Sequence, residues 1–194
     1  MKVEDLIVLG KGKVHSDFAK MLLADLLGMN SLELLFHLDD EVGEEIQEEY
    51  RKKLSLLMEK KPVQYVIGNV SFCGLPLKVD SRVLIPRFET EELVENTVLF
   101  IEQIFPDNRI NIVDLGCGSG AIGLALKKKI PSSSVLLVDI SKDALEVAQE
   151  NAKSLELNVA FLQSDMLEKV EGKFDVIVSN PPYIREDEKI EDIV

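Results

Sequence analysis

The stretch Ile110-Asn-Ile-Val-Asp-Leu-Gly-Cys-Gly-Ser-Gly120 decides the fold, because an apolar run ends in a loop that contains three glycines. Glycine lets the backbone turn tightly and approach a ligand that a Cβ would obstruct. A helical pattern begins at Ala121, and the free N–H groups of its first turn would face the same loop. The stretch therefore predicts a strand, a loop and a helix that hold a nucleotide-like cofactor. A glycine-rich turn without a ligand is the alternative.

The segments that follow alternate between strand and helix patterns. Apolar runs occur at 110–115, 135–138, 159–162 and 174–179, and helical patterns occur at 121–129 and 142–155. Such alternation predicts βαβ units with a parallel sheet. We therefore expect an α/β fold with four parallel strands, in which the strand at 174–179 lies near an edge.

The beginning of the chain is predicted to be helical. Apolar residues recur at helical spacing over 16–27 and 41–59. Ser16 is the expected N-cap of the first helix, and Gly28 is its expected C-terminal stop. Residues 1–61 are therefore predicted to form a small helical domain, which could be a simple cap or a domain that docks a partner.

The sequence pattern changes after Pro62. Short β-branched and aromatic runs, broken by glycine and proline, predict a β-hairpin linker at 62–86. A helix with acidic residues in its first turn is predicted at 89–105. Residues 87–194 are predicted to form the domain that binds the cofactor.

Charge and cysteine content disfavour several functions. The chain has 22 basic and 35 acidic residues, and its net charge of −13 at pH 7 repels nucleic-acid backbones. Cys73 and Cys117 are too few for a disulfide framework, and nothing near them has the spacing of a metal site. We expect a cytoplasmic protein without a metal site or a membrane partner. The acidic charge disfavours direct binding to nucleic acid, although a local basic groove stays open.

Two acidic residues follow the next two apolar runs. Asp139 ends the run at 135–138, where a carboxylate could accept hydrogen bonds from both hydroxyls of a ribose. Asp165 follows the run at 159–162 and could accept a hydrogen bond from an adenine amine. The alternatives are a helix N-cap for Asp139 and an ordinary loop acid for Asp165.

The loop also fits a dinucleotide fingerprint. Gly118-Ser-Gly-Ala-Ile-Gly123 has the spacing G-x-G-x-x-G, and Asp139 follows about twenty residues later. In a dinucleotide site, however, the first glycine ends the strand, and here that residue is Gly116. The turn glycines then have a tighter spacing, which suits a nucleoside cofactor without a pyrophosphate.

The segment Ser179-Asn-Pro-Pro-Tyr183 carries the most specific chemistry. Its two prolines fix φ and remove two N–H donors, so a stiff tip presents the Asn180 side chain and nearby carbonyl oxygens as acceptors. An amide or aromatic amine nitrogen is a poor nucleophile because its lone pair is delocalised. Two acceptors that hold its hydrogens would direct that lone pair at an electrophile, and Tyr183 could stack on the planar group. A plain proline turn is the alternative.

Two sets of motifs resemble known families. Four features resemble the class I S-adenosylmethionine-dependent methyltransferases that modify planar nitrogen groups: Asp114–Gly120, Asp139, Asp165 and Asn180–Tyr183. Upstream residues are similar to the peptide chain release factor N(5)-glutamine methyltransferases: Gln64, Tyr65, Gly68, Phe72, Gly74 and Ile85-Pro-Arg-Phe-Glu-Thr-Glu91. That family has a helical N-terminal domain, a β-hairpin linker and a Pro-Arg-x-Glu-Thr motif. Phe88 replaces the proline common after the arginine.

The resemblance implies a Rossmann-like methyltransferase sheet that binds S-adenosylmethionine. The residues implied to bind it are Gly116, Cys117, Gly118, Ser119, Gly120, Asp139, Asp165, Met166 and Asn180. The glycines would line the methionine part and Asp139 would hold the ribose. Asp165 and Met166 would flank the adenine, and Arg87 and Thr90 would border the cofactor.

The resemblance also implies a substrate and a partner. The implied catalytic residues are Asn180, Pro181 and Tyr183, and the implied substrate-binding residues are Asn180, Pro181, Pro182 and Tyr183. The substrate would be the glutamine of the Gly-Gly-Gln motif in class I release factors, and the helical domain would help to dock the factor. Methyltransferases of this class add about three more strands after this point, so we expect a chain truncated at its C-terminus.

Two other functions stay open on the sequence alone. An adenine amino-methyltransferase acting on DNA or RNA could use the same tip on a flipped base, although the net charge of −13 argues against it. A noncatalytic fragment could keep only partial affinity for the cofactor.

Overall fold

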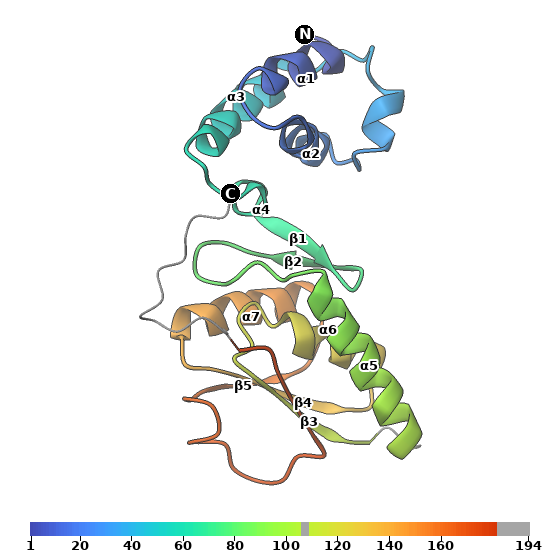
Figure 1. The fold of residues 1–194 in the computed structure, drawn as a ribbon, viewed down its shortest axis with the longest axis vertical. Helices are drawn as coiled ribbons and strands as arrows, with labels where there is room; N and C mark the ends of the chain where they lie inside the picture. Colours follow the sequence, from blue (N-terminus) through green and yellow to red (C-terminus); the bar gives the residue numbers. More distant parts are fainter. Residues whose placement is uncertain (106–108, 182–194) are drawn as a thin grey trace. The chain divides into compact units, whose positions relative to one another are not determined.

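The computed structural model describes residues 1–105 and 109–181. It divides into two compact units, Met1–Asn69 and Val70–Val194. Figure 1 shows that the first unit is helical and that the second contains the sheet. No helix in the described part of the chain is long and apolar enough to span a membrane.

The first unit is built from short helices around one apolar core. Its elements are α1 (Val3–Lys11), α2 (Ser16–Leu26), the 3-10 helix η1 (Glu33–Phe36), α3 (Glu44–Met58) and α4 (Val63–Ile67). The fully buried side chains include Leu6, Leu22, Leu23, Tyr50 and Leu54. Other buried residues of the same helices, Val3 in α1, Ala19 in α2 and Leu57 in α3, lie three or four positions from them, so each helix turns one apolar face to the shared core.

Two polar side chains of α3 satisfy backbone groups inside this core. The hydroxyl of Tyr50 donates to the carbonyl oxygen of Ala19 at 3.2 Å, and Nε2 of Gln47 donates to that of Val42 at 2.7 Å. Burial raises the pKa of Tyr50 to about 12, which keeps the phenol protonated as a donor. A Cβ on Gly10 would collide with the Tyr50 hydroxyl and with Ala19, so only glycine lets α1 approach so closely.

The structure differs from the sequence predictions at three places in the first unit. The helix α1 lies within the predicted helical domain but was not predicted as an element of its own. The N-cap of α2 is His15, whose ring accepts from the backbone N–H of Asp17, and not Ser16, whereas Gly28 has the left-handed φ of 70° expected of a helix stop. Val63–Ile67 is helical instead of part of the hairpin, because Val63 and Val66 are both buried in this core and burial overrides the strand propensity of valine.

The second unit contains a four-stranded parallel sheet in the order β5-β4-β3-β6. Its strands are β3 (Asn111–Leu115), β4 (Ser134–Asp139), β5 (Ala160–Gln163) and β6 (Val176–Ser179). Its helices are α5 (Glu89–Ile104), α6 (Ala121–Lys129) and α7 (Lys142–Ser154). The predicted α/β class and parallel sheet are therefore confirmed, and among the described strands β6 lies at an edge, as expected.

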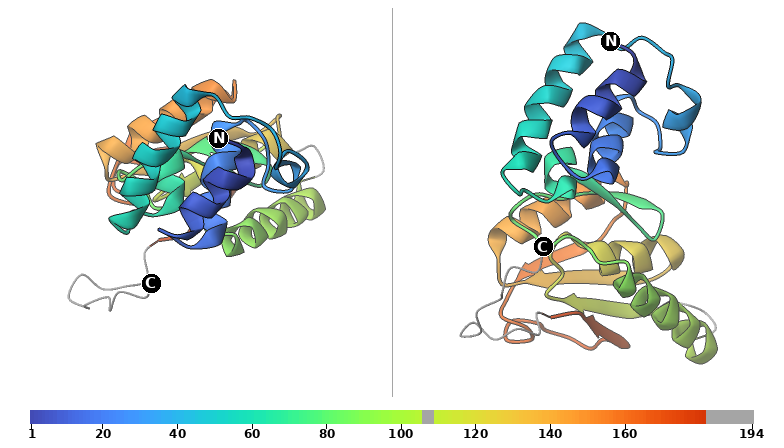
Figure 2. Two further views of the ribbon diagram at one scale, coloured as in Figure 1. Left: turned by 90° about the horizontal axis from the view of Figure 1, so that it is seen from above. Right: turned by 45° about the horizontal axis from the view of Figure 1, so that its top comes forward.

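The two faces of the sheet have different coverings. Ile112 and Leu137 pack with α6 and α7 in the larger core, and Figures 1 and 2 show these helices lying over the strands. Val113, Leu115 and Val138 face the other way, where they pack with residues that include Val170 and Phe174 from the segment between β5 and β6. Because strand side chains alternate between faces, the near-continuous apolar runs of the sequence reflect burial on both sides.

A β-hairpin precedes α5. It consists of β1 (Asn69–Phe72) and β2 (Leu75–Lys78), which are joined by a turn in which Cys73 and Gly74 both have positive φ. The backbone N–H of Cys73 donates to Oε1 of Glu91 in α5 at 2.9 Å. The predicted hairpin is present, but it begins after α4.

Candidate functional site

The predicted site residues follow the carboxyl ends of the strands. Leu115 of β3 is paired in register with Val138 of β4 and with Ser179 of β6, and Asp139 is paired with Gln163 of β5. Since the strands are parallel, the segments that follow them emerge at one edge of the sheet. In open α/β sheets, ligands bind at this edge.

The glycine loop leaves β3 at this edge and has room for a ligand. Gly116, Gly118 and Gly120 have φ values of 68°, 54° and 80°, a region that side-chain-bearing residues rarely adopt. A Cβ built on Gly116 or Gly118 would meet none of the described residues within 4 Å, so as far as the structure describes the chain the loop backbone borders open space. Gly120 caps α6, and a Cβ there would crowd Leu124 at 3.1 Å. The loop therefore offers a backbone surface at a helix N-terminus.

Asp139 ties the glycine loop to the end of β4. Its Oδ2 accepts from the N–H of Gly118 at 2.8 Å, and its Oδ1 accepts from the N–H of Ser141 at 2.9 Å. Ser141, and not Asp139, is the N-cap of α7, because its hydroxyl accepts from the N–H of Ala144 at 3.2 Å. The helix-cap alternative for Asp139 is therefore wrong. Its carboxylate is half-buried beside the loop and keeps further lone pairs for a ligand.

Cys117 and Ser119 lie in the loop, but their side chains are buried. The N–H of Cys117 donates to the carbonyl oxygen of Val138 at 2.9 Å, and burial raises the pKa of its thiol. A thiol held in its neutral form is a poor nucleophile, so Cys117 acts as a small apolar filler. The carbonyl oxygen of Ser119 accepts from Nδ2 of Asn151 at 2.9 Å.

Asp114 lies beneath the glycine loop and is completely buried. Its Oδ2 accepts from the N–H of Gly123 at 2.9 Å, and its Oδ1 has no hydrogen-bond partner among the residues that the structure describes. Desolvation raises the pKa of this carboxyl to about 7, and the negative charge of Asp139 adds to the rise. A Cβ on Gly123 would collide with Leu137, so glycine at this position lets α6 approach the sheet and reach Asp114.

The segment after β5 carries Asp165 and Met166. Both side chains are exposed, and Met166 has an unusual positive φ of 44°. The neighbouring Ser164 is buried, its N–H donates to the carbonyl oxygen of Asp139 at 3.1 Å, and its hydroxyl accepts from the N–H of Lys169. These bonds fix the start of the segment beside Asp139.

The segment after β6 begins with Asn180 and Pro181. The hydroxyl of Ser179 donates to the carbonyl oxygen of Leu115 at 2.8 Å, which fastens the strand end. Nδ2 of Asn180 donates to Oγ1 of Thr90 in the first turn of α5 at 3.1 Å. Pro181 is exposed, and the predicted site residues Pro182 and Tyr183 lie outside the described residues. The structure thus brings Thr90 together with the tip, a contact that the sequence did not reveal.

Asn151 of α7 is a second supporting residue that sequence analysis missed. It is fully buried, its Oδ1 accepts from the N–H of Lys78 at 2.6 Å, and its Nδ2 donates to the carbonyl oxygens of Lys78 and Ser119 at 3.1 and 2.9 Å. One side chain therefore holds the hairpin and the glycine loop together. A signal was present, because Asn151 continues the apolar stripe of Ala144 and Ala148 at helical spacing.

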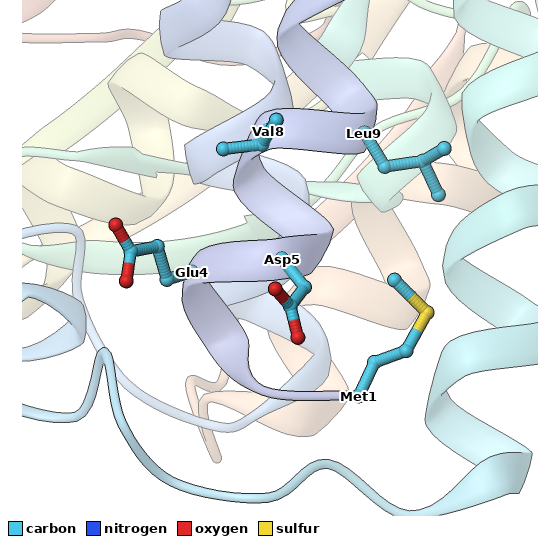
Figure 3. A pocket seen from close by; sticks show the side chains of 5 residues that line it. All are labelled: Met1, Glu4, Asp5, Val8 and Leu9. Carbon is cyan, nitrogen blue, oxygen red and sulfur yellow. The ribbon is translucent and has the colours of Figure 1, made fainter.

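A pocket lies elsewhere, on the first unit. It is lined by Met1, Glu4, Asp5, Val8 and Leu9 of the N-terminal segment and α1 (Figure 3). None of the predicted site residues is among these lining residues. Among the described residues, no group of three or more histidine, cysteine, aspartate or glutamate side chains could hold a metal ion.

Family models match most of the chain. The methyltransferase small domain matches residues 86–194, and the PrmC N-terminal domain matches residues 13–68. The chain therefore belongs to the methyltransferase small domain family.

Two curated relatives of this chain share one name within this family. The chain is 42% identical over 187 residues to the release factor glutamine methyltransferase of Streptococcus pneumoniae and 44% identical over 174 residues to that of Bacillus subtilis. These alignments cover 95% and 88% of this chain but 64% and 60% of the relatives, so the chain spans about three fifths of their length. With both family models, they confirm the resemblance to the release factor glutamine methyltransferases.

A solved structure supports the fold. Wild-type Trm5b from Pyrococcus abyssi superimposes with a TM-score of 0.50 and 23% sequence identity, covering 59% of this chain and 33% of that one. At this level of identity, the likeness concerns the fold alone.

Proposed function

We propose that the protein uses S-adenosylmethionine to methylate the side-chain amide nitrogen of the glutamine in the Gly-Gly-Gln motif of class I peptide chain release factors. One observation carries the proposal. Across the sheet, Asp165 after β5, Asp139 at the end of β4, the glycine loop after β3 and Asn180 after β6 follow one another in that order at the carboxyl ends of the strands.

This order matches the parts of the proposed cofactor. Asp165 and Met166 would flank the adenine, Asp139 would accept from the ribose hydroxyls, and the loop from Gly116 to Gly120 would line the methionine part. The open space beside Gly116 and Gly118 fits a ligand pressed against the backbone, because a Cβ would occupy it. When bound, the cofactor supplies an electrophilic methyl group.

The residues after β6 would hold the substrate. The side-chain oxygen of Asn180 and the carbonyl oxygen of Pro181 would accept the two hydrogens of the glutamine amide, and Pro182 and Tyr183 would complete the substrate wall. These two hydrogen bonds would localise the nitrogen lone pair and point it at the methyl group that is transferred. The nitrogen becomes acidic as the new bond forms, so one amide proton can leave to water without a dedicated base.

The remaining parts of the proposal concern organisation and partner. We assign residues 1–61 as a docking domain for the release factor, 62–86 as a linker and 87–194 as the cofactor domain. The match of the PrmC N-terminal domain at 13–68 and the names of the relatives support this assignment. A cytoplasmic location is proposed because Cys73 and Cys117 are both free thiols.

A competition assay tests the function. The full-length protein is incubated with labelled S-adenosylmethionine, a class I release factor and an oligonucleotide that contains adenine. We expect label in the release factor, at the Gly-Gly-Gln glutamine by mass spectrometry, and none after replacement of that glutamine by alanine. Label in the oligonucleotide instead would favour an adenine amino-methyltransferase, and label in neither would favour a noncatalytic role.

A further inference from the structure

Thr90 lies in the first turn of α5 and touches the residue proposed to hold the substrate. Its Oγ1 accepts from Nδ2 of Asn180 at 3.1 Å across 90 residues of sequence, and both side chains are half-buried. The N–H of Thr90 donates to the carbonyl oxygen of Arg87 at 3.0 Å, so its backbone is fixed by the start of the helix. The hydroxyl therefore occupies a defined place beside the strand tip.

This bond sets the direction of the Asn180 amide. A carboxamide has one acceptor end and one donor end, and a substrate NH2 group needs the acceptor. When Nδ2 points at Thr90, Oδ1 points away from it. Both threonine and serine carry a hydroxyl that can accept this bond. The β-branched side chain of threonine also restricts χ1, so its hydroxyl is held in fewer orientations.

We propose that Thr90 is a positioning residue that orients the Asn180 carboxamide so that its oxygen faces the substrate amide. The inference rests on the proposed function, since it takes Asn180 to be the residue that holds the substrate. Thr90, the threonine of the Pro-Arg-x-Glu-Thr segment, would thus help to align Asn180, in addition to any contact of the segment with the cofactor.

The test uses three variants of the full-length protein. Thr90→Val has nearly the same shape but lacks the hydroxyl, and Thr90→Ser keeps the hydroxyl. Thr97→Val is the matched control, because Thr97 lies in the same helix and its hydroxyl donates to the carbonyl oxygen of Leu93 at 2.7 Å within that helix. Each variant is assayed for kcat and KM with a release factor, and for S-adenosylmethionine affinity by calorimetry.

We expect Thr90→Val to lower kcat about tenfold, with KM for the release factor and cofactor affinity changed less than about twofold. Thr90→Ser should restore most of kcat, and Thr97→Val should leave it unchanged. Unchanged kcat in Thr90→Val, or failure of Thr90→Ser to rescue, would overturn the inference. A loss of cofactor affinity that accounts for the whole defect would also overturn it, because Thr90 would then act as a cofactor ligand.

A second measurement does not depend on methylation. The side-chain NH2 resonances of Asn180 are recorded by 15N NMR in the wild type and in Thr90→Val. Loss of the bond should shift these resonances in Thr90→Val and leave them unchanged in Thr97→Val. Unshifted resonances would contradict the bond itself, whereas shifted resonances in a protein that methylates no release factor would overturn the proposed function while showing that the bond between Thr90 and Asn180 exists.

Discussion

The two units bury polar groups to different degrees. Among the described residues, the first unit buries the side chain of Gln47 and the hydroxyl of Tyr50, whereas the second buries Asp114, Ser119, Ser133, Asn151 and Ser164. A buried polar group destabilises a protein unless it is hydrogen-bonded. In the second unit, most of these groups support the loops at the carboxyl ends of the strands. The difference shows that the helical unit is held together mainly by apolar packing. The sheet unit also depends on buried hydrogen bonds that fix the loops at the carboxyl ends of its strands.

The largest effect is expected from removing the most connected of these groups. Asn151→Leu keeps the approximate volume but leaves backbone groups of Lys78 and Ser119 without partners, so we expect a loss of about 3 kcal/mol in the stability of the second unit. Gln47→Met is the counterpart in the first unit. It removes the buried bond to the carbonyl oxygen of Val42 and the partly buried bond from Arg51, and we expect a loss of about 1 kcal/mol in the stability of that unit.

Native-state hydrogen exchange reads these two variants separately in each unit. Asn151→Leu should also weaken S-adenosylmethionine binding, because the glycine loop loses its support, and Gln47→Met should not. Equal losses of stability in the two variants would contradict the claim that the second unit depends more on its buried polar groups than the first unit does.

A pH-dependent effect is expected from Asp114. Its pKa is raised from 3.8 to about 7 in the folded state, so the folded protein holds this proton more tightly than the unfolded chain does. The corresponding contribution to stability is fully present below about pH 4 and is lost as the pH rises through 7. Asp114→Asn keeps an acceptor for Gly123 but does not titrate.

Urea unfolding of both proteins isolates this contribution. Relative to Asp114→Asn, the wild type should lose about 2.5 kcal/mol between pH 5 and pH 8. Parallel pH profiles of the two proteins would show that Asp114 is already ionised at pH 5 and is better solvated than its burial indicates.

A smaller effect is expected where both units use glycine for close packing. A Cβ on Gly10 would meet Tyr50 and Ala19, and a Cβ on Gly123 would meet Leu137 and Asp114. Gly10→Ala and Gly123→Ala should each destabilise their own unit by about 1 to 2 kcal/mol, because overpacking forces neighbours to shift. Only Gly123→Ala should reduce cofactor affinity in a calorimetric titration. Reduced affinity in Gly10→Ala would indicate a coupling between the units that this account does not include.

The sheet unit could be predicted from the sequence more completely than the helical unit. Its central strands β3 and β4 are largely buried on both faces, so they appear as apolar runs, and α6 begins and ends at the predicted residues Ala121 and Lys129. The helix α1 was missed although its buried residues Val3, Ile7 and Gly10 follow helical spacing, because the consecutive apolar residues 6–9 obscure that spacing. The segment Val63–Ile67 was misjudged because local propensity does not show which core will bury a valine.

Individual site residues could be predicted only where their position next to a strand end in the sequence determines their place. The glycine loop and Asp139 are such residues, because the carboxyl ends of parallel strands lie together. The contacts of Thr90 with Asn180 and of Asn151 with Lys78 join residues 90 and 73 positions apart, respectively, and therefore depend on tertiary packing.

The most direct test of the account is a calorimetric titration of the full-length protein with S-adenosylmethionine. Asp139→Ala is compared with Asp143→Ala, an exposed aspartate in the first turn of α7 that serves as the control. We expect saturable binding by the wild type and Asp143→Ala, and at least about thirtyfold weaker binding by a folded Asp139→Ala, since charge-assisted hydrogen bonds are lost. No binding by the folded wild type, or undiminished binding by Asp139→Ala, would contradict it.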